Sequence, residues 1–167
     1  MLKVSIGIIE NSSDEILISN RENKKIFNNH WEFPGGKLQD RELPEEALVR
    51  ELNEELGIAP IEFFHIDNIK YHYTDYTIEL IPFVIKQYSG VITSKEGQGL
   101  KWVSIEQLSQ IKIIPASKPV IEYLLANNQQ REILKLTLFL CCFESLELVS
   151  YSKNRTAIKC FPPLISG

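Results

Sequence analysis

The pattern of apolar residues between positions 44 and 57 constrains the fold of this chain more than any other feature. Leucine recurs at every fourth position, which places one apolar stripe along a helix, at Leu48, Leu52 and Leu56. Pro44 suits the first helical position, where no backbone N–H is needed, and Gly57 suits the left-handed residue that often follows the last turn. The sequence therefore predicts an amphipathic helix over 44–56 with a buried leucine face.

Strands are predicted around this helix. Leu2–Ile8 alternates apolar and polar residues, which is typical of a half-buried strand, and Glu15–Ser19 is expected to return beside it as a hairpin. Further strands are expected at 63–73, 77–88 and 100–103, and further helices at 105–110 and 118–126. Strands interleaved with helices indicate the α/β (α+β) class, a sandwich with mixed strand directions.

The composition argues against several classes of protein. Of 167 residues, 18 are Lys or Arg and 22 are Asp or Glu, a formal net charge of −4, so the basic footprint of a nucleic-acid binder is missing. No apolar run is long enough to span a bilayer, and no secretory signal is evident. The cysteines (Cys141, Cys142 and Cys160) are too few and too irregular for a disulfide framework. We therefore expect a cytoplasmic protein without nucleic-acid or membrane partners.

The composition of the sequence changes after the polar run Asn127–Gln130. Residues 129–167 carry an apolar run and the cysteines but no motif or repeat. We expect residues 1–128 to form one domain and 129–167 a C-terminal extension whose role the sequence does not assign.

Three carboxylates project from one side of the predicted helix. Glu51, Glu54 and Glu55 stand at i, i+3 and i+4, a spacing at which like charges destabilise an isolated helix by about 0.2–0.5 kcal/mol per pair. A hard divalent cation such as Mg²⁺ or Mn²⁺ would neutralise them and bridge to substrate phosphates. A solvated acidic face accounts for the same cluster equally well.

The residues around this cluster favour a cation site. Pro34, Gly35 and Gly36 are expected to interrupt regular structure and bring backbone close to a ligand, with the Gly35 carbonyl as a possible metal ligand. Arg50 is placed to hold the carboxylates by bidentate hydrogen bonds, and Glu42 to orient Arg50, although an ordinary surface ion pair is the alternative for Arg50.

These residues together resemble the Nudix hydrolase family. Gly36, Glu42 and the run Arg50–Ile58 (RELNEELGI) match the complete Nudix box, at a chance frequency on the order of 10⁻⁹ per starting position. The likeness extends over residues 3–125 to the MutT-type branch, the 8-oxo-dGTP diphosphatases. It is carried there by Arg21, residues 32–37, residues 95–98, Trp102 and residues 115–120.

The resemblance implies a Nudix α/β/α sandwich, with a mixed β-sheet between helices, that uses Mg²⁺ (or Mn²⁺) and water to convert a nucleoside triphosphate into a monophosphate and pyrophosphate. It implies metal ligands at the Gly35 carbonyl, Glu51, Glu54, Glu55 and Glu96. Glu51 and Glu96 are both candidates for activating the water, with Arg50 supporting the catalytic glutamates. The implied nucleotide contacts are Arg21, Glu32, Phe33, Pro34, Gly35 and Ser117.

Two departures from the MutT pattern bear on the choice of base. Ser117 stands where the family has an asparagine that reads the oxidised purine, and a hydroxyl is shorter than an amide with its fixed donor and acceptor. Ile26 stands where the family has a nucleotide-contacting histidine, and His30 is only a nearby substitute.

Three readings of function are compared. The leading one is an 8-oxo-dGTP diphosphatase, expected to be a monomer that protects the nucleotide pool. The alternatives are a pyrophosphatase for another triphosphate, such as a cytidine or methylated-base nucleotide, and a non-catalytic nucleotide-binding module. The intact box glutamates argue against the binding module. Tyr71, Tyr73 and Tyr76 are expected to pack across strands, with base stacking as the other possibility.

Overall fold

The computed structural model describes residues 1–21, 26–130 and 133. The chain divides into two compact units, Met1–Asn128 and Gln129–Gly167. Almost all of the second unit, including the expected C-terminal extension and the cysteines, lies outside the described residues. All the helices and strands named below lie in the first unit.

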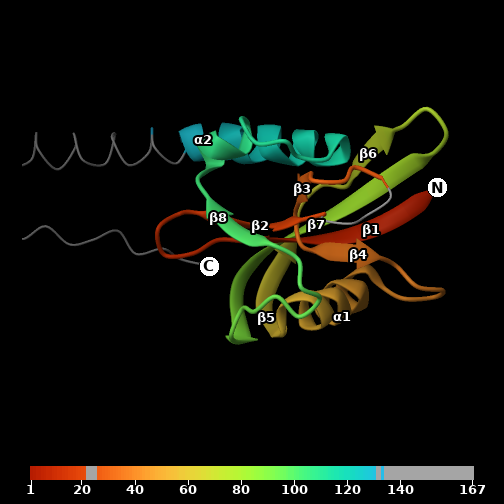
Figure 1. Ribbon diagram of the computed structural model, residues 1–167, viewed down its shortest axis with the longest axis horizontal. Helices are drawn as coiled ribbons and strands as arrows, with labels where there is room; N and C mark the ends of the chain where they lie inside the picture. The colour runs from red at the N-terminus through yellow and green to blue at the C-terminus, as the bar shows by residue number, and fades with distance from the viewer. Residues whose placement is uncertain (22–25, 131–132, 134–167) are drawn as a thin grey trace, which may run out of the picture. The chain divides into compact units, whose positions relative to one another are not determined.

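Two β-sheets form the centre of this unit (Figure 1). The larger has the order β4 (Gly35–Lys37), β1 (Leu2–Ile9), β7 (Thr77–Gly90), β5 (Ile58–His65), with β6 (Ile69–His72) also paired to β7. The smaller has the order β3 (Trp31–Glu32), β2 (Ile16–Asn20), β8 (Leu100–Val103). β1 and β7 run parallel and the other pairs are antiparallel, so the predicted mixed sheet is confirmed.

The predicted long helix is α1 (Pro44–Leu56), with Pro44 at its start and Gly57 in the left-handed conformation (φ 71°) after its end. It lies on one side of the sheets, while α2 (Ile105–Leu108) and the helical residues 118–128 lie on the other (Figure 1). A short 3₁₀ helix, η1 (Pro115–Ser117), precedes residue 118. The α/β/α sandwich is therefore confirmed. Among the described residues, no helix is both long and apolar enough to cross a membrane.

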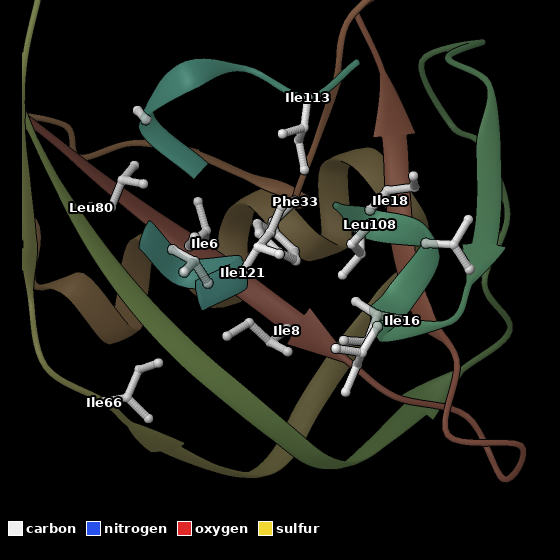
Figure 2. Close-up of a cluster of buried hydrophobic side chains, with 14 of the residues drawn as sticks. Ile6, Ile8, Ile16, Ile18, Phe33, Ile66, Leu80, Leu108, Ile113 and Ile121 are labelled. Carbon is white, nitrogen blue, oxygen red and sulfur yellow. The ribbon is translucent and has the colours of Figure 1, made fainter. Parts of the chain in front are cut away.

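Each side of the larger sheet has its own hydrophobic core. The three leucines of α1 are fully buried in one core, together with residues such as Ile81 and Phe83 of β7. Figure 2 shows the other core, where β1, β2 and β7 meet α2 and the helix that starts at 118; its labelled members include Ile6, Ile18, Leu80, Leu108 and Ile121. Because both faces are covered, the strands position α1 and the loops firmly relative to one another.

The close approach of α1 to β1 fixes the height of the helix above the sheet. A Cβ atom added to Gly7 would lie 3.1 Å from a methyl carbon of Leu52, so glycine allows this approach. The Ser5 hydroxyl donates a 2.8 Å hydrogen bond to the Pro44 carbonyl and ties the first turn of α1 to the same strand. The acidic residues of α1 are thereby held at the edge of the sheet where β4 lies.

Three local predictions were wrong. The expected hairpin is present only at its turn, where Glu10 and Ile16 form an antiparallel bridge; beyond it β1 and β2 belong to different sheets, and β1 pairs with β4 and β7 instead. Gly35 and Gly36 do not interrupt regular structure but form β4 with Lys37, because pairing with β1 outweighs the low strand preference of glycine. The strand expected at 63–73 is two strands, β5 and β6, and β5 already begins at Ile58.

Candidate active site

A pocket of about 560 Å³ opens beside the face of β1 and β7 opposite α1. Carboxylates line it at one edge, from Glu32, Glu51, Glu55 and Glu96. Aromatic residues line it elsewhere, at Phe27, Phe33, Tyr73 and Tyr76, and apolar side chains of the two central strands include Val4, Ile78 and Leu80. Its surface is therefore acidic in one part and apolar or aromatic in another.

The position of Glu51 depends on a glycine in β4. A Cβ atom added to Gly36 would lie only 2.1 Å from the carboxyl carbon of Glu51, so this carboxylate rests directly against the strand. Gly35 is equally constrained, because its φ is +139° and a Cβ atom there would lie 2.2 Å from the Ser5 carbonyl oxygen. The two glycines thus let α1 carboxylates and β4 backbone meet.

Glu55 is the most perturbed acid of the site. Its pKa is raised to about 8, chiefly by burial and in addition by the nearby charges of Glu32, Glu51 and Glu96, against the opposing effect of a 3.0 Å hydrogen bond from the Gly35 N–H. Carboxylates that lie so close together in a partly buried site are stabilised when one of them is protonated or when a cation binds between them.

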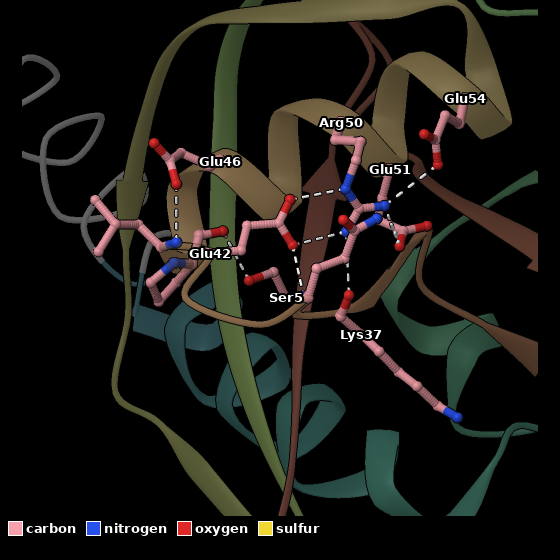
Figure 3. Close-up of polar contacts among 10 residues, drawn as sticks. Ser5, Lys37, Glu42, Glu46, Arg50, Glu51 and Glu54 are labelled. Carbon is pink, nitrogen blue, oxygen red and sulfur yellow. Dashed lines mark hydrogen bonds and ion pairs between the residues drawn. The ribbon is translucent and has the colours of Figure 1, made fainter.

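Arg50 ties the carboxylates of α1 to the loop before the helix (Figure 3). Its guanidinium donates two hydrogen bonds to Glu42, of 2.7 and 2.9 Å, so the predicted contact between these residues is present. It also donates to Glu51 at 2.7 Å, to Glu54 at 3.2 Å and to the Lys37 carbonyl at 3.1 Å. The hydrogen bonds from Arg50 hold the pKa of Glu42 at about 2, which keeps this carboxylate charged.

The loop that carries Glu96 is anchored to the last turn of α1. The Glu55 carbonyl accepts hydrogen bonds from the Lys95 N–H at 2.9 Å and from the Gln98 side-chain amide at 3.0 Å. The carbonyl oxygen of the Gln98 side chain accepts from the Glu96 N–H at 3.1 Å. Gln98 therefore links the backbone of Glu55 to that of Glu96. The only sequence signal for this role was that residues 95–98 resemble the MutT-type branch.

The predicted nucleotide contacts are mostly brought to the pocket. Arg21 and Glu32 line it and form an ion pair of 2.5 Å with each other. Phe33 and Ser117, both only 2% exposed, and Gly35 also line it. Pro34 is absent from the lining, and its carbonyl accepts a 2.8 Å hydrogen bond from the Gly7 N–H in β1.

Two of the residues predicted from the helix also lie outside the lining, namely Arg50 and Glu54. Glu54 is half-exposed and bonded to Arg50. Conversely, the lining includes Phe27, which the sequence did not single out, and Tyr73 and Tyr76, which were expected to pack across strands. The two tyrosines bracket the short turn between the strands expected at 63–73 and 77–88, and this position was the only sequence signal for them.

The donor set fits a hard divalent cation by its chemistry. Carboxylate and carbonyl oxygens are the ligands that Mg²⁺ and Mn²⁺ prefer, and Glu51, Glu55 and Glu96 line the pocket together with Gly35. No three Asp, Glu, His or Cys side chains in the described part of the chain are already close enough together to hold a metal ion. Glu51 and Glu54 instead bond to Arg50, and Glu55 bonds to the Gly35 N–H.

Comparison with known proteins gives consistent matches. A family model described as "NUDIX domain" matches residues 5–123. The "8-oxo-dGTP diphosphatase" of Escherichia coli K12 is 39% identical over 120 residues, covering 72% of this chain and 93% of that protein. The "CTP pyrophosphohydrolase" of the same organism is 32% identical over 131 residues, covering 78% and 96% respectively.

Solved structures agree with the sequence matches. A MutT structure, from work on the Aliivibrio salmonicida and Vibrio cholerae proteins, has a TM-score of 0.65 at 32% identity and covers 75% of this chain and 98% of its own. The solution structure of the E. coli ORF135 protein has a TM-score of 0.69 at 32% identity and covers 78% and 93%.

Proposed function

We propose that this chain, which belongs to the Nudix family, hydrolyses 8-oxo-dGTP to 8-oxo-dGMP and pyrophosphate. It is a hydrolase that acts on phosphorus anhydrides, and Nudix hydrolases generally need a divalent metal ion. Its metal ion is Mg²⁺, with Mn²⁺ as a substitute, and its catalytic domain is residues 1–128. The enzyme acts as a monomer in the cytoplasm and removes oxidised nucleotides before they are incorporated into DNA. Residues 131–167 are proposed to be dispensable for this activity, so a chain truncated after Gln130 should stay folded and active.

One observation carries the reaction type. The carboxylates of Glu51, Glu55 and Glu96 come from two separate segments and line one pocket beside the backbone of Gly35. A cluster of carboxylates repels a polyanionic substrate unless a cation lies between them. The neighbouring apolar and aromatic lining supplies what a nucleobase needs.

The residues that would hold the cation are the Gly35 carbonyl, Glu51, Glu54, Glu55 and Glu96. A bound divalent ion supplies Lewis-acid chemistry, neutralising phosphate oxygens and making a coordinated water more acidic. The protein itself holds the metal-binding groups in place. Arg50 fixes the Glu51 carboxylate, and Gln98 fixes the backbone of Glu96 relative to Glu55.

Two carboxylates remain candidates for taking the proton from the attacking water. Glu51 lines the pocket and is held in place by a 2.7 Å ion pair with Arg50. Glu96 lines the same pocket from an exposed loop, and its N–H donates to the Gln98 side chain. Separate Glu51→Gln and Glu96→Gln variants distinguish them, because loss of the base removes the acidic limb of the pH–rate profile.

The substrate is tested by competition. Release of pyrophosphate is measured in a mixture of 8-oxo-dGTP, dGTP and dCTP with Mg²⁺, and 8-oxo-dGTP is expected to have the highest kcat/KM. A preference for dCTP would favour the second candidate, a cytidine nucleotide pyrophosphatase, which the 32% identical CTP pyrophosphohydrolase supports. If folded protein turned over none of the three with either Mg²⁺ or Mn²⁺, the binding module would be the better account.

A further inference from the structure

Tyr76 has a large aromatic side chain that is 41% exposed and yet lines the pocket. Its ring stacks on that of Tyr73, with centroids 4.8 Å apart and planes at 27°. Stacking on one side leaves the other face of a ring available. Exposed aromatic surface beside a pocket is typical of a surface that a ligand covers.

Tyr73 gives Tyr76 a fixed support. Its hydroxyl accepts a 3.3 Å hydrogen bond from the Ala116 N–H, and its ring contacts Tyr71 at 4.8 Å and Phe27 at 5.5 Å. The Tyr73 N–H donates to the Tyr76 carbonyl at 2.9 Å and closes the turn between β6 and β7. Tyr76 is therefore held by a turn and a neighbouring ring that are themselves restrained.

The sheet separates this ring from the acidic residues by a defined span. In the larger sheet β4 lies at one side, next to β1, then β7, and β6 pairs with the far side of β7 in its first half. β4 and β6 are therefore three strand spacings apart, about 14 Å when measured across the sheet. The acids gather beside β4, and Tyr76 lies at the β6–β7 turn, with Val4 and Leu80 lining the pocket between them. The polarity matches that of a nucleotide, which has a charged polyphosphate at one end and a flat base at the other.

We propose that Tyr76 is the stacking platform for the substrate base and thereby determines how strongly this enzyme prefers purine over pyrimidine nucleotides. This inference deepens the proposed function, because it takes the ligand to be a nucleotide whose phosphates lie at the carboxylates. A purine has the larger ring system and covers more of the tyrosine face, so it gains more from the contact than a pyrimidine does.

The first test compares Tyr76→Ala with Tyr76→Phe in steady-state kinetics. Base–aromatic stacking of ordinary strength corresponds to a change in affinity of about 5- to 150-fold. We expect the alanine variant to raise KM for a purine triphosphate by at least about fivefold, with a smaller rise for dCTP and kcat nearly unchanged. The phenylalanine variant keeps the ring and should behave as wild type. Tyr123→Ala is the matched control, because Tyr123 is 40% exposed and lies outside the pocket lining.

The second test measures binding without turnover, so that it remains informative if the proposed hydrolysis is wrong. Calorimetric affinities are compared for dGMP, which has a base, and for inorganic tripolyphosphate, which has none. Tyr76→Ala should weaken dGMP binding and leave tripolyphosphate binding unchanged. Unchanged dGMP affinity, or equal loss for both ligands, would overturn the inference. If the alanine variant does not fold, Tyr76→Leu replaces it with an apolar side chain that lacks a ring, and the same outcomes apply.

Discussion

The contact between Gly36 and Glu51 gives the sharpest test of how β4 positions the catalytic acids. Gly36→Ala adds one methyl group in a strand whose backbone at this position is not left-handed, so the new residue meets no conformational penalty there. The added Cβ would lie 2.1 Å from the Glu51 carboxyl carbon and 2.2 and 2.4 Å from its oxygens. The carboxylate must therefore move.

The size of the effect follows from these distances. Ordinary van der Waals contact begins at 3.4 Å, so the carboxylate must shift by roughly 1 Å or more, which also breaks its 2.7 Å hydrogen bond with Arg50. A misplacement of about 1 Å in a catalytic site can cost about 100-fold in rate, or about 2.7 kcal/mol. The free energy of unfolding should change little, because the displaced group is the end of a flexible, partly exposed side chain.

The assay is kcat for nucleotide hydrolysis, measured beside thermal unfolding. Gly99→Ala is the matched control, because a Cβ atom there meets its nearest neighbour at 3.4 Å. We expect Gly36→Ala to lose about 100-fold in kcat and Gly99→Ala to lose little. If Gly36 acts through Glu51, adding Gly36→Ala to a Glu51→Gln enzyme should cost almost nothing more. Retained activity in Gly36→Ala, or fully additive losses in the double variant, would refute the reasoning.

Further predictions concern the charges of the site. Arg50→Lys should lower kcat about 10- to 100-fold, because one ammonium cannot bond Glu42, Glu51 and the Lys37 carbonyl together; a pH–rate profile and kcat would show it. For Glu55 the folded pKa of about 8 lies above the ordinary 4.5, so metal-free wild type should lose stability relative to Glu55→Gln as pH rises from 4.5 to about 8; a thermal midpoint difference independent of pH would contradict this. For Glu42, whose folded pKa is about 2, the sign is opposite, and stability relative to Glu42→Gln should be lost as pH falls from 4.5 to about 2. Gln98→Ala should lower kcat/KM by about tenfold with little change in thermal midpoint, because it frees Glu96 from α1; unchanged kcat/KM would remove Gln98 from the site.

Local sequence patterns were enough to predict α1 and most of the acidic cluster. Helix bounds, the buried leucine stripe and the left-handed Gly57 depend on residues within a few positions of one another, so periodicity and end signals suffice to locate them. Glu51, Glu54 and Glu55 follow from the same register. The resemblance to the MutT-type branch, which extends beyond the Nudix box, added Glu96 and the nucleotide contacts, since spacing alone gives no reason to bring residue 96 to the helix.

The pairing of strands and the packing of segments that are distant in the sequence could not be predicted from local patterns. β1 pairs with the distant strands β4 and β7, while β2 joins a different sheet after the bridge Glu10↔Ile16, and no local signal in residues 2–19 predicts this choice of partners. Likewise, the docking of the Glu96 loop on α1 and the stacked pair Tyr73–Tyr76 beside the pocket arise from contacts between remote segments. Local patterns determine whether a segment forms a helix or a strand. Its pairing and packing partners depend on the whole domain, because each strand edge and each apolar face can be covered only once.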